Sequence, residues 1–377
     1  MHWTFYFMYA LASLLGIGIL WHLLSLWLVR HRSRPAEGDE LPGVSVIVAA
    51  HNELLNLREL LPLLLAQDYP LLEVIVVDDR SWDDSYEYLY YLQAEHPQLR
   101  VVRVEQTPEH ITHKKFAITM GVKAARYDIV LLTDADCRPV SKQWVRYMVA
   151  PFIRKAKRQF VLGASLYEQR SGFLNALIRY ETLYTLWQYA TAALLGMPYM
   201  GVGRNLAYRR SFFLKNKGFG PHQRLVSGDD DLLVNRLATA KNTALCLHAD
   251  AITISKPKQR WRDWWRQKRR HLSVGKYYKL QDRALLALLF LSHVSFYVAL
   301  VWVVMHMRGV ASFGILQLIA LEVVLLLVLH PLCLFLLAKK LRSSLPILWL
   351  PFLDLSYLLY ISVIGLWALL TKVEKWN

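Results

Sequence analysis

Four long apolar runs bracket the polar part of this 377-residue chain, and they constrain its fold more than any other feature. The first two runs contain no Asp, Glu, Lys or Arg, the third contains only Glu322, and the fourth contains only Asp354. The runs cover residues 3–29, 284–307, 314–338 and 345–371. About 20 apolar residues in a helix cross the ~30 Å hydrocarbon core of a bilayer. The sequence therefore predicts four transmembrane helices around a polar block, residues 30–283.

The first run is expected to remain in the protein as an anchor. A cleaved signal peptide begins with basic residues and has a shorter apolar core. Here the basic residues Arg30, Arg32 and Arg34 follow the run instead of preceding it.

Basic residues cluster in the segments that join the apolar runs to the rest of the chain. The clusters are residues 30–34, 256–279 and 339–342. All three lie on one side of the membrane if the polar block is cytoplasmic, which the positive-inside rule favours. Lys372 and Lys375 in the tail weakly oppose this orientation. The sequence predicts an integral membrane protein, expected in a bacterial inner membrane, with its catalytic block in the cytoplasm.

Strand and helix patterns alternate through the first half of the polar block. Runs rich in Val, Ile and Leu predict buried strands at residues 44–50, 72–77, 99–104 and 129–132. Helical patterns at residues 54–66 and 114–125 lie between them. This alternation predicts a parallel sheet with right-handed crossovers, in which ligands bind at the carboxyl ends of the strands. Asp78, Asp79, Asp134 and Asp136 fall at such ends.

The sequence Asp134-Ala135-Asp136 follows the fourth predicted strand. Two carboxylates in this arrangement can hold a hard divalent cation while leaving positions for diphosphate oxygens. The bound cation would neutralise charge on a departing nucleotide diphosphate. The alternative is that these aspartates only form a turn.

Three adjacent carboxylates, Asp229, Asp230 and Asp231, precede an apolar helical run. One of them is expected to cap that helix, because the helix dipole favours an acidic N-terminus. Three like charges in a row repel one another, so a second role is also expected. A carboxylate here can act as a general base on an acceptor hydroxyl.

Two further segments allow more than one interpretation. Residues 261–271 are dense in Trp, Arg and Lys. They predict an interfacial helix at the headgroup level, some of whose cations can also clamp a diphosphate. Residues 173–195 are apolar and aromatic with Arg179 and Glu181 embedded, and they predict either a core helix or an amphipathic helix at the bilayer surface.

Taken in order, these motifs resemble a membrane-bound family 2 glycosyltransferase with a GT-A fold, over residues 44–278. Residues 44–53 resemble the family's opening strand, and Val77-Asp78-Asp79-Arg80-Ser81 resembles its uridine-contacting motif. Asp134-Ala135-Asp136 matches its metal and diphosphate motif. Residues 228–236 resemble the Gly-Asp-Asp segment of hyaluronan-synthase-like enzymes, and residues 267–271 resemble Gln-x-x-Arg-Trp with His271 in place of the tryptophan.

The resemblance implies roles for individual residues of this chain. Asp230 is implied as the catalytic base, with Asp229 as the alternative in a different register. Mg²⁺ or Mn²⁺ is implied on Asp136, with Asp134 nearby. The nucleotide-sugar contacts implied are Ala50, Glu53, Asp78, Asp79, Lys114, Asp134, Gln267 and Arg270. The acceptor-side residues implied are Gly203, Asn205 and His271.

The predicted fold is an α/β, Rossmann-like, mostly parallel sheet flanked by helices, together with about four transmembrane helices. The expected domains are an anchor (1–30), a GT-A domain (40–255), an interfacial segment (256–283) and a C-terminal three-helix bundle (284–377).

The function implied is inverting transfer of a sugar from a nucleotide sugar, expected to be a UDP-sugar, to a lipid or lipid-linked acceptor at the cytoplasmic face. One alternative is a processive polysaccharide synthase, although four spans are few for a polymer channel. Another is a non-enzymatic, membrane-tethered module that uses its formal net charge of +16 to bind nucleic acid or lipid. The strand-end carboxylates would repel phosphate in the absence of a metal, so membrane lipids are expected as partners and nucleic acid is not.

The two carboxylates inside predicted spans, Glu322 and Asp354, are costly to expose to lipid. Both are expected to point into the helix bundle, with Asp354 nearer the active site. The structural interpretation is that either carboxylate lies near an interface, or is protonated and hydrogen-bonded between helices. The functional one is a polar path for an acceptor headgroup.

Overall fold

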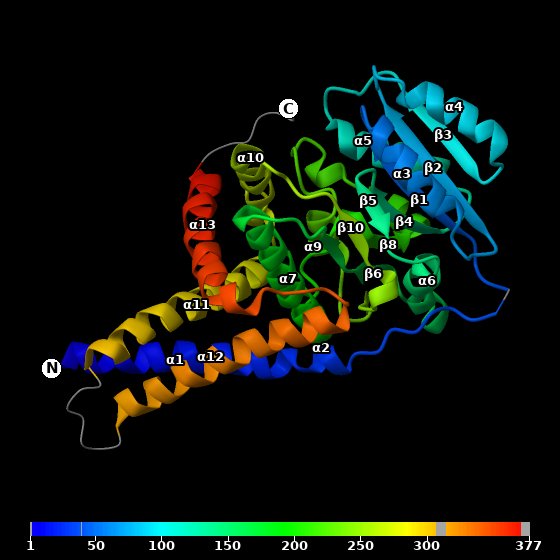
Figure 1. The fold of residues 1–377 in the computed structure, drawn as a ribbon. Helices are drawn as coiled ribbons and strands as arrows, with labels where there is room; N and C mark the ends of the chain where they lie inside the picture. The colour runs from blue at the N-terminus through cyan, green and yellow to red at the C-terminus, as the bar shows by residue number, and fades with distance from the viewer. Residues whose placement is uncertain (1, 39, 307–313, 371–377) are drawn as a thin grey trace.

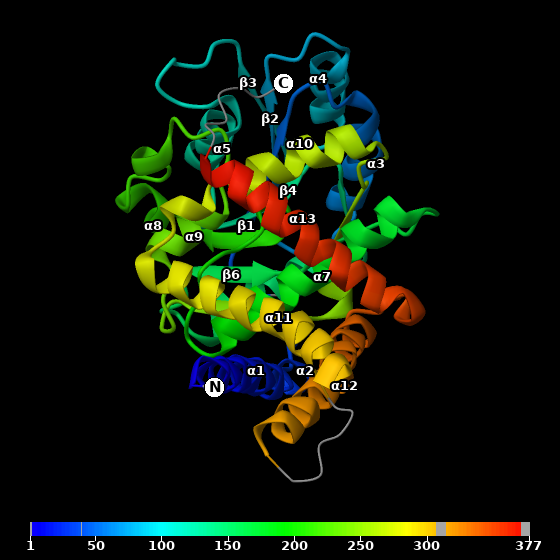
Figure 2. The same ribbon diagram turned by 90° about the vertical axis from the view of Figure 1, so that its left-hand side faces the viewer.

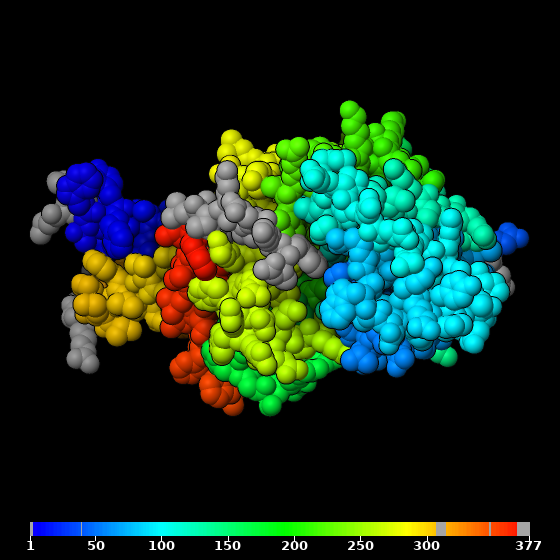
Figure 3. All heavy atoms as spheres, turned by 90° about the horizontal axis from the view of Figure 1, so that it is seen from above, coloured from blue at the N-terminus to red at the C-terminus, as the bar shows by residue number. Residues whose placement is uncertain are grey.

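The computed structural model describes residues 2–38, 40–306 and 314–370 and consists of an α/β body with long helices attached to it (Figure 1). Helices α1 (His2–Ser25) and α12 (Ile315–Lys340) pack together and project from the body (Figures 1 and 3). Residue 307, residue 371 and the tail lysines Lys372 and Lys375 lie outside the described residues.

Four parallel strands form one half of the main sheet, which within the described residues has seven strands in the order β3-β2-β1-β4-β8-β6-β9. The parallel strands are β1 (Val44–Ala50), β2 (Leu72–Asp79), β3 (Leu99–Val104) and β4 (Ile129–Asp134). The register pairs Ala50 with Asp78 and Ala49 with Asp134. The predicted mostly parallel sheet is confirmed, and its acidic residues end neighbouring strands.

The other half of the main sheet is formed later in the chain. Strand β8 (Leu206–Arg209) lies antiparallel to β4, and β6 (Phe160–Gly163) and β9 (Thr243–Cys246) follow it. A small second sheet contains β5 (Cys137–Pro139), β10 (Thr253–Ser255) and β7 (Ser165–Tyr167). Because β5 begins directly after Asp136, this second sheet fixes the turn that carries Asp134 and Asp136.

Alternate residues of the central strands face two separate hydrophobic clusters, because successive side chains of a strand point to opposite faces. Ile47 and Val77 pack with α5 (His113–Ala124) and α7 (Phe173–Leu194). Val46 and Val48 pack with α3 (Leu54–Leu65) and α6 (Trp144–Arg154). Helix α7 is buried along most of its length, which favours the interpretation of residues 173–195 as a core helix. The remaining body helices are α4 (Ser85–Glu95), α8 (Arg210–Lys215), α9 (Asp231–Leu237) and α10 (Trp261–Leu272).

Four helical segments of the described chain are long and apolar enough to cross a membrane, as predicted. They are Trp3–Arg30, which includes α2 (Trp27–Arg30), and α11 (Leu280–His306), α12, and the Leu350–Trp367 part of α13 (Leu350–Leu370). The fourth helix begins at Leu350 and not at the predicted residue 345. Pro346 precedes it, and proline restricts the residue before it to extended conformations.

The four apolar helices do not form one parallel bundle. Helices α1, α11 and α12 pack on one another, whereas the main partners of α13 are α7 and α10 of the body. Figure 1 shows α13 at a steep angle to α1 and α12, and Figure 2 shows it crossing in front of the body. Asp354 of α13 is buried, and Oε2 of Glu322 in α12 is buried too, with Gly16 of α1 opposite that side chain. Both carboxylates therefore point inward, as predicted.

Candidate active site

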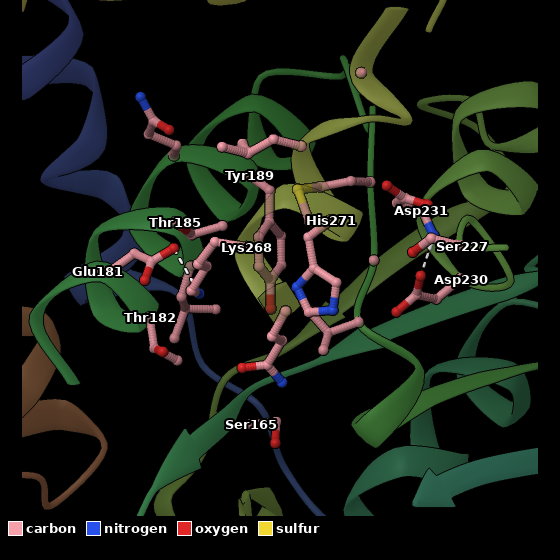
Figure 4. A pocket seen from close by; sticks show the side chains of 18 of the residues that line it. Ser165, Glu181, Thr182, Thr185, Tyr189, Ser227, Asp230, Asp231, Lys268 and His271 are labelled. Atoms are coloured by element: carbon pink, nitrogen blue, oxygen red, sulfur yellow. Dashed lines mark hydrogen bonds and ion pairs between the residues drawn. The ribbon is translucent and has the colours of Figure 1, made fainter. Parts of the chain in front are cut away.

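A cavity of about 470 Å³ opens at the carboxyl end of β4 and is bounded by α5, α7, α9 and α10, with α11 and α13 on its membrane side. It brings together eight of the residues singled out from the sequence. They are Lys114, Asp134, Asp136, Asp229, Asp230, Gln267, Arg270 and His271. Figure 4 shows His271 beside Tyr189, with Asp230 on one side and the pair Lys268–Glu181 on the other.

Lys114 joins the two acidic motifs of the cavity. Its Nζ lies 3.0 Å from Oδ1 of Asp134 and 3.2 Å from Oδ2 of Asp229. Burial alone would lower the pKa of Lys114, but the surrounding carboxylates raise it above the ordinary lysine value. Lys114 is therefore a fixed cation at the centre of the site.

Asp136 is the carboxylate of the cavity best suited to hold a cation. It is half-buried, and no Lys or Arg of the described chain lies within ion-pair distance of it. Burial and the adjacent Asp134 raise the pKa of Asp136, so a bound cation would relieve a real electrostatic penalty. No group of three or more His, Cys, Asp or Glu in the described residues surrounds a common metal position. The residues thus fit a cation that takes its other oxygen ligands from a diphosphate and water.

The three adjacent aspartates have three different environments. Burial would raise the pKa of Asp229, but Lys114 and Lys115 lower it. Burial and the neighbouring Asp229 raise the pKa of Asp230, whose Oδ1 accepts from the amide of Asp231 (2.8 Å) as the cap of α9. Burial and Asp230 raise the pKa of Asp231 to about 8, and Tyr278 donates a 2.8 Å hydrogen bond to its Oδ2. Among the described residues, Asp230 accepts hydrogen bonds only from backbone amides and has no ion-pair partner, and it lines the cavity.

Gly203 and Asn205, two of the residues expected on the acceptor side, have different environments. The amide of Gly203 donates a 2.7 Å hydrogen bond to Oδ2 of Asp230, so Gly203 belongs to the site. Asn205 does not: its side chain is fully buried and does not line the cavity. Its amide group bonds Ala164, Ala251 and Trp144 and braces the junction of the two sheets. The expectation of an acceptor contact at Asn205 is therefore corrected to a structural role.

The remaining predicted nucleotide contacts lie along the neighbouring sheet edge and not in the lining of this cavity. Ala50 ends β1, and burial raises the pKa of Glu53 just after it. Asp79 is held by Arg80 at 2.8 Å. Both side-chain oxygens of Asp78 are buried, burial raises the pKa of this carboxyl, and Ser81 is the neighbour that lowers it most. A buried acceptor of this kind is expected to receive a donor from a ligand, such as an N–H group of a base.

Helix α10 forms one wall of the cavity and packs against α13. Gln267, Arg270 and His271 line it, while Trp264 is buried against Tyr360 of α13. Trp264 therefore packs inside the protein, whereas Trp261 of the same helix is exposed. Lys268 forms a buried 2.6 Å ion pair with Glu181 of α7.

Two cationic residues of the site, Arg204 and Lys115, were not predicted from the sequence. Arg204 lines the cavity, lies over the ring of Tyr167 at 4.4 Å and donates to Ser255. Lys115 is buried, and its Nζ donates to the carbonyls of His222, Leu225 and Ser227 at 2.6–2.8 Å. Arg204 lies between Gly203 and Asn205, which were expected on the acceptor side, and this position is a usable signal. Lys115 carries no signal beyond its neighbour Lys114, because its partners lie more than a hundred residues away in the sequence.

The fold and the acidic strand ends define an α/β domain joined to long apolar helices, and comparison with known proteins shows what this domain is similar to. The family model described as "Glycosyl transferase family 2" matches residues 45–215. This part of the chain is similar to family 2 glycosyltransferases, and the described chain adds four helical segments that are long and apolar enough to cross a membrane.

Individual relatives are distant. Residues of this chain are 25% identical to the "Probable glycosyltransferase YdaM" of Bacillus subtilis over 286 residues, which is 71% of this chain and 66% of that protein. They are 29% identical to the poly-beta-1,6-N-acetyl-D-glucosamine synthase of Staphylococcus aureus (strain COL) over 147 residues, 38% of this chain and 34% of that one. The chain thus matches less than two thirds of the length of these relatives.

One solved structure resembles the chain along nearly its whole length. It is the mannosyltransferase PcManGT from Pyrobaculum calidifontis in complex with GDP-Man and Mn²⁺, with a TM-score of 0.53 and 21% sequence identity. The superposition covers 96% of this chain and 99% of that one. At this identity the likeness shows the fold.

Proposed function

We propose that this chain transfers a single sugar, with inversion, from a nucleotide sugar to a lipid or lipid-linked acceptor at the cytoplasmic face of a bacterial inner membrane. The observation that carries the proposal is the extent of the cavity. Its lining begins at Asp134, Asp136 and Asp230 and continues to Phe290 of α11 and Ile361 of α13. A donor held at the sheet edge and an acceptor held among membrane helices would meet in one space.

The proposed chemistry is a single displacement. Asp230 accepts the proton of an acceptor hydroxyl, the hydroxyl oxygen forms a bond to the anomeric carbon, and the bond from that carbon to the diphosphate breaks. The nucleoside diphosphate leaves with the electron pair. Gly203 positions Asp230 through its amide, and the ion pairs of Lys114 with Asp134 and Asp229 hold the two acidic motifs together.

A divalent cation, Mg²⁺ or Mn²⁺, is proposed on Asp136 with Asp134 beside it. When bound, the cation supplies charge neutralisation for the leaving diphosphate. The Mn²⁺ and GDP-Man named with PcManGT support a metal and a nucleotide sugar as ligands. Arg204 and Arg270, which line the same cavity, are proposed to contact the diphosphate.

The donor is proposed to be a UDP-sugar, with its base near Asp78 and Asp79 and its diphosphate near Lys114. Ala50 and Glu53 line the same strand ends, and Gln267 approaches from α10. The buried carboxylate of Asp78 supports this proposal, because it can accept a hydrogen bond from N3–H of uracil.

A processive polysaccharide synthase is the second candidate, and the likeness to poly-beta-1,6-N-acetyl-D-glucosamine synthase supports it. The full-length protein in lipid nanodiscs, supplied with UDP- and GDP-sugars, a divalent cation and a membrane lipid extract, tests both candidates. Mass spectrometry of the products is expected to show one added sugar on a lipid. A ladder of products would favour the synthase, and no nucleoside diphosphate release from any donor would contradict a transferase of either kind.

A further inference from the structure

A second cavity, of about 270 Å³, lies among the apolar helices. Its walls come from α1, α7, α11, α12 and α13, and most of its lining is apolar. Leu327 of α12 is 48% exposed, and Pro351 of α13 is exposed as well. These two lining residues mark a mouth between α12 and α13 on the surface that faces lipid.

Asp354 is the centre of a polar cluster on the wall of this second cavity. Its Oδ1 accepts a short hydrogen bond from the hydroxyl of Tyr180 and lies 3.4 Å from Nε2 of His330. Its Oδ2 lies 2.7 Å from the hydroxyl of Tyr297 and 2.9 Å from Nε2 of His293. A carboxylate among membrane helices is costly unless it is paired, and this one has four partners.

The histidines of the cluster are engaged at every ring nitrogen. Nδ1 of His22 donates to the carbonyl of Gly18 (2.7 Å), which leaves Nε2 to accept from Nδ1 of His330 (3.1 Å). Nδ1 of His293 lies 3.4 Å from the hydroxyl of Tyr184, a contact as long as that between His330 and Asp354. Each ring nitrogen of these histidines therefore has a partner in the described chain, and the contact of His293 with Tyr184 is one of the two longest.

The two cavities meet at the contact between Tyr184 and His293. Tyr184, Gln188 and His293 line both of them. Gln188 also reaches the hydroxyl of Tyr184 at 3.4 Å. Contacts of this length are weak, and an alcohol, which both donates and accepts, can insert between the hydroxyl of Tyr184 and the ring of His293.

The charges of the two cavities differ. The catalytic cavity contains Lys114, Arg204, Lys268 and Arg270, which suit a diphosphate. The described residues that line the second cavity include no Lys or Arg, and they do include the carboxylate of Asp354. A lipid phosphate entering from the bilayer would meet the carboxylate of Asp354, and the two histidines beside it, His293 and His330, are already bonded to that carboxylate.

We infer that the acceptor is an uncharged lipid with a free hydroxyl group. It enters between α12 and α13, keeps its apolar part in the second cavity, and passes its hydroxyl group between Tyr184 and His293 into the catalytic cavity that contains Asp230. Asp354 is a positioning residue that holds His293 for this passage. The inference rests on the proposed function and names the class of its acceptor.

The test uses the full-length protein in nanodiscs, the best donor from the screen, and the lipids of the source membrane separated by anion exchange into uncharged and anionic fractions. Transfer to lipid is measured against hydrolysis of the donor in the same reaction. Glycosylated product in the uncharged fraction, at least tenfold above the anionic fraction, is expected. Product mainly in the anionic fraction, or donor hydrolysis without product in either, overturns the inference while leaving donor chemistry intact. Absence of hydrolysis and transfer together overturns the proposed function itself.

A pair of variants tests the route. Leu327→Trp narrows the mouth, and Leu325→Trp places the same side chain at a 40% exposed position of the same helix that does not line the cavity. The ratio of lipid transfer to donor hydrolysis is expected to fall at least tenfold in Leu327→Trp and to stay within twofold in Leu325→Trp. Equal ratios in the two variants would refute entry at this mouth. Asp354→Asn is expected to raise the KM for the lipid at least tenfold while the KM for the donor stays within threefold, and equal rises in both would refute the positioning role.

Discussion

The backbone amide of Gly203 donates a 2.7 Å hydrogen bond to Oδ2 of Asp230, across 27 residues of sequence. Together with the amide of Asp231 on Oδ1, this bond fixes the carboxylate on the wall of the catalytic cavity. A base held by amide donors keeps one geometry toward its substrate. A Cβ at residue 203 would stand 3.4 Å from Oδ2 of Asp230, so this backbone segment lies in direct contact with the carboxylate.

Replacing Asp230 tests the assignment of the base. Asp230→Asn keeps the shape but cannot accept a proton, so transfer is expected to fall at least ~10²–10⁴-fold, the usual range for general-base catalysis. Donor binding, measured by calorimetry, is expected to stay within a few fold. Asp229→Asn is the control, and it is expected to keep measurable transfer with weaker donor binding through the loss of its pairing with Lys114. A dead Asp229→Asn beside an active Asp230→Asn would show that Asp229 is the base.

The proposed cation site is tested at Asp136. Asp136→Ala is expected to abolish activity together with Mn²⁺ binding in the presence of the nucleoside diphosphate, because Asp134 is already paired with Lys114. Calorimetric titration of Mn²⁺ into the wild type and the variant measures the binding directly. Full turnover of the wild type in excess chelator would rule out a role for the metal.

The stability of the protein is expected to depend on pH through Asp231. Burial and Asp230 raise its pKa from 3.8 to about 8, so the folded state binds this proton more tightly than the unfolded state does. The stability that the proton contributes is fully present below a pH of about 4 and is lost as the pH rises through about 8.

Asp231→Asn cannot ionise, so it serves as the reference for this effect. The Tm of Asp231→Asn minus that of the wild type is expected to increase between pH 5 and 8, because only the wild type loses stability as this carboxyl ionises. The difference in the free energy of unfolding is expected to scale with the difference between the folded and unfolded pKa values. Differential scanning fluorimetry across this range measures the difference. A difference that stays constant with pH would mean that Asp231 titrates alike in both states.

Lys115 is expected to hold the loop that precedes the three aspartates. Lys115→Met keeps the buried apolar stem but leaves three carbonyls without their donor, which is expected to destabilise the protein by at least ~1–3 kcal/mol. The kcat/KM is expected to fall more than tenfold, because the loop sets the position of Asp229 and Asp230. Lys123→Met, an exposed position on the same helix, is the matched control. Two variants with the same Tm and kcat/KM would argue against the clamp.

Much of the architecture is readable from local sequence patterns. The β-branched runs that became β1 to β4, the four apolar runs and the acidic strand ends are local features, and a parallel sheet brings its strand ends to one edge by geometry alone. The placement of Asp134, Asp136 and Lys114 around one cavity follows from that rule. The position of these residues at one edge of the sheet can therefore be predicted without knowing how the side chains pack.

What the sequence by itself determined is the fold class, the apolar helices and the set of acidic and basic residues at the site. Only the tertiary structure decided that Asn205 braces the sheets, that the three aspartates differ in partner, and that Asp354 receives Tyr180 and His293 from two other helices. The physical reason is the range of the interactions. Hydrophobic period and strand propensity act within a few residues, whereas hydrogen-bond partners and burial depend on segments that folding brings together from distant parts of the chain.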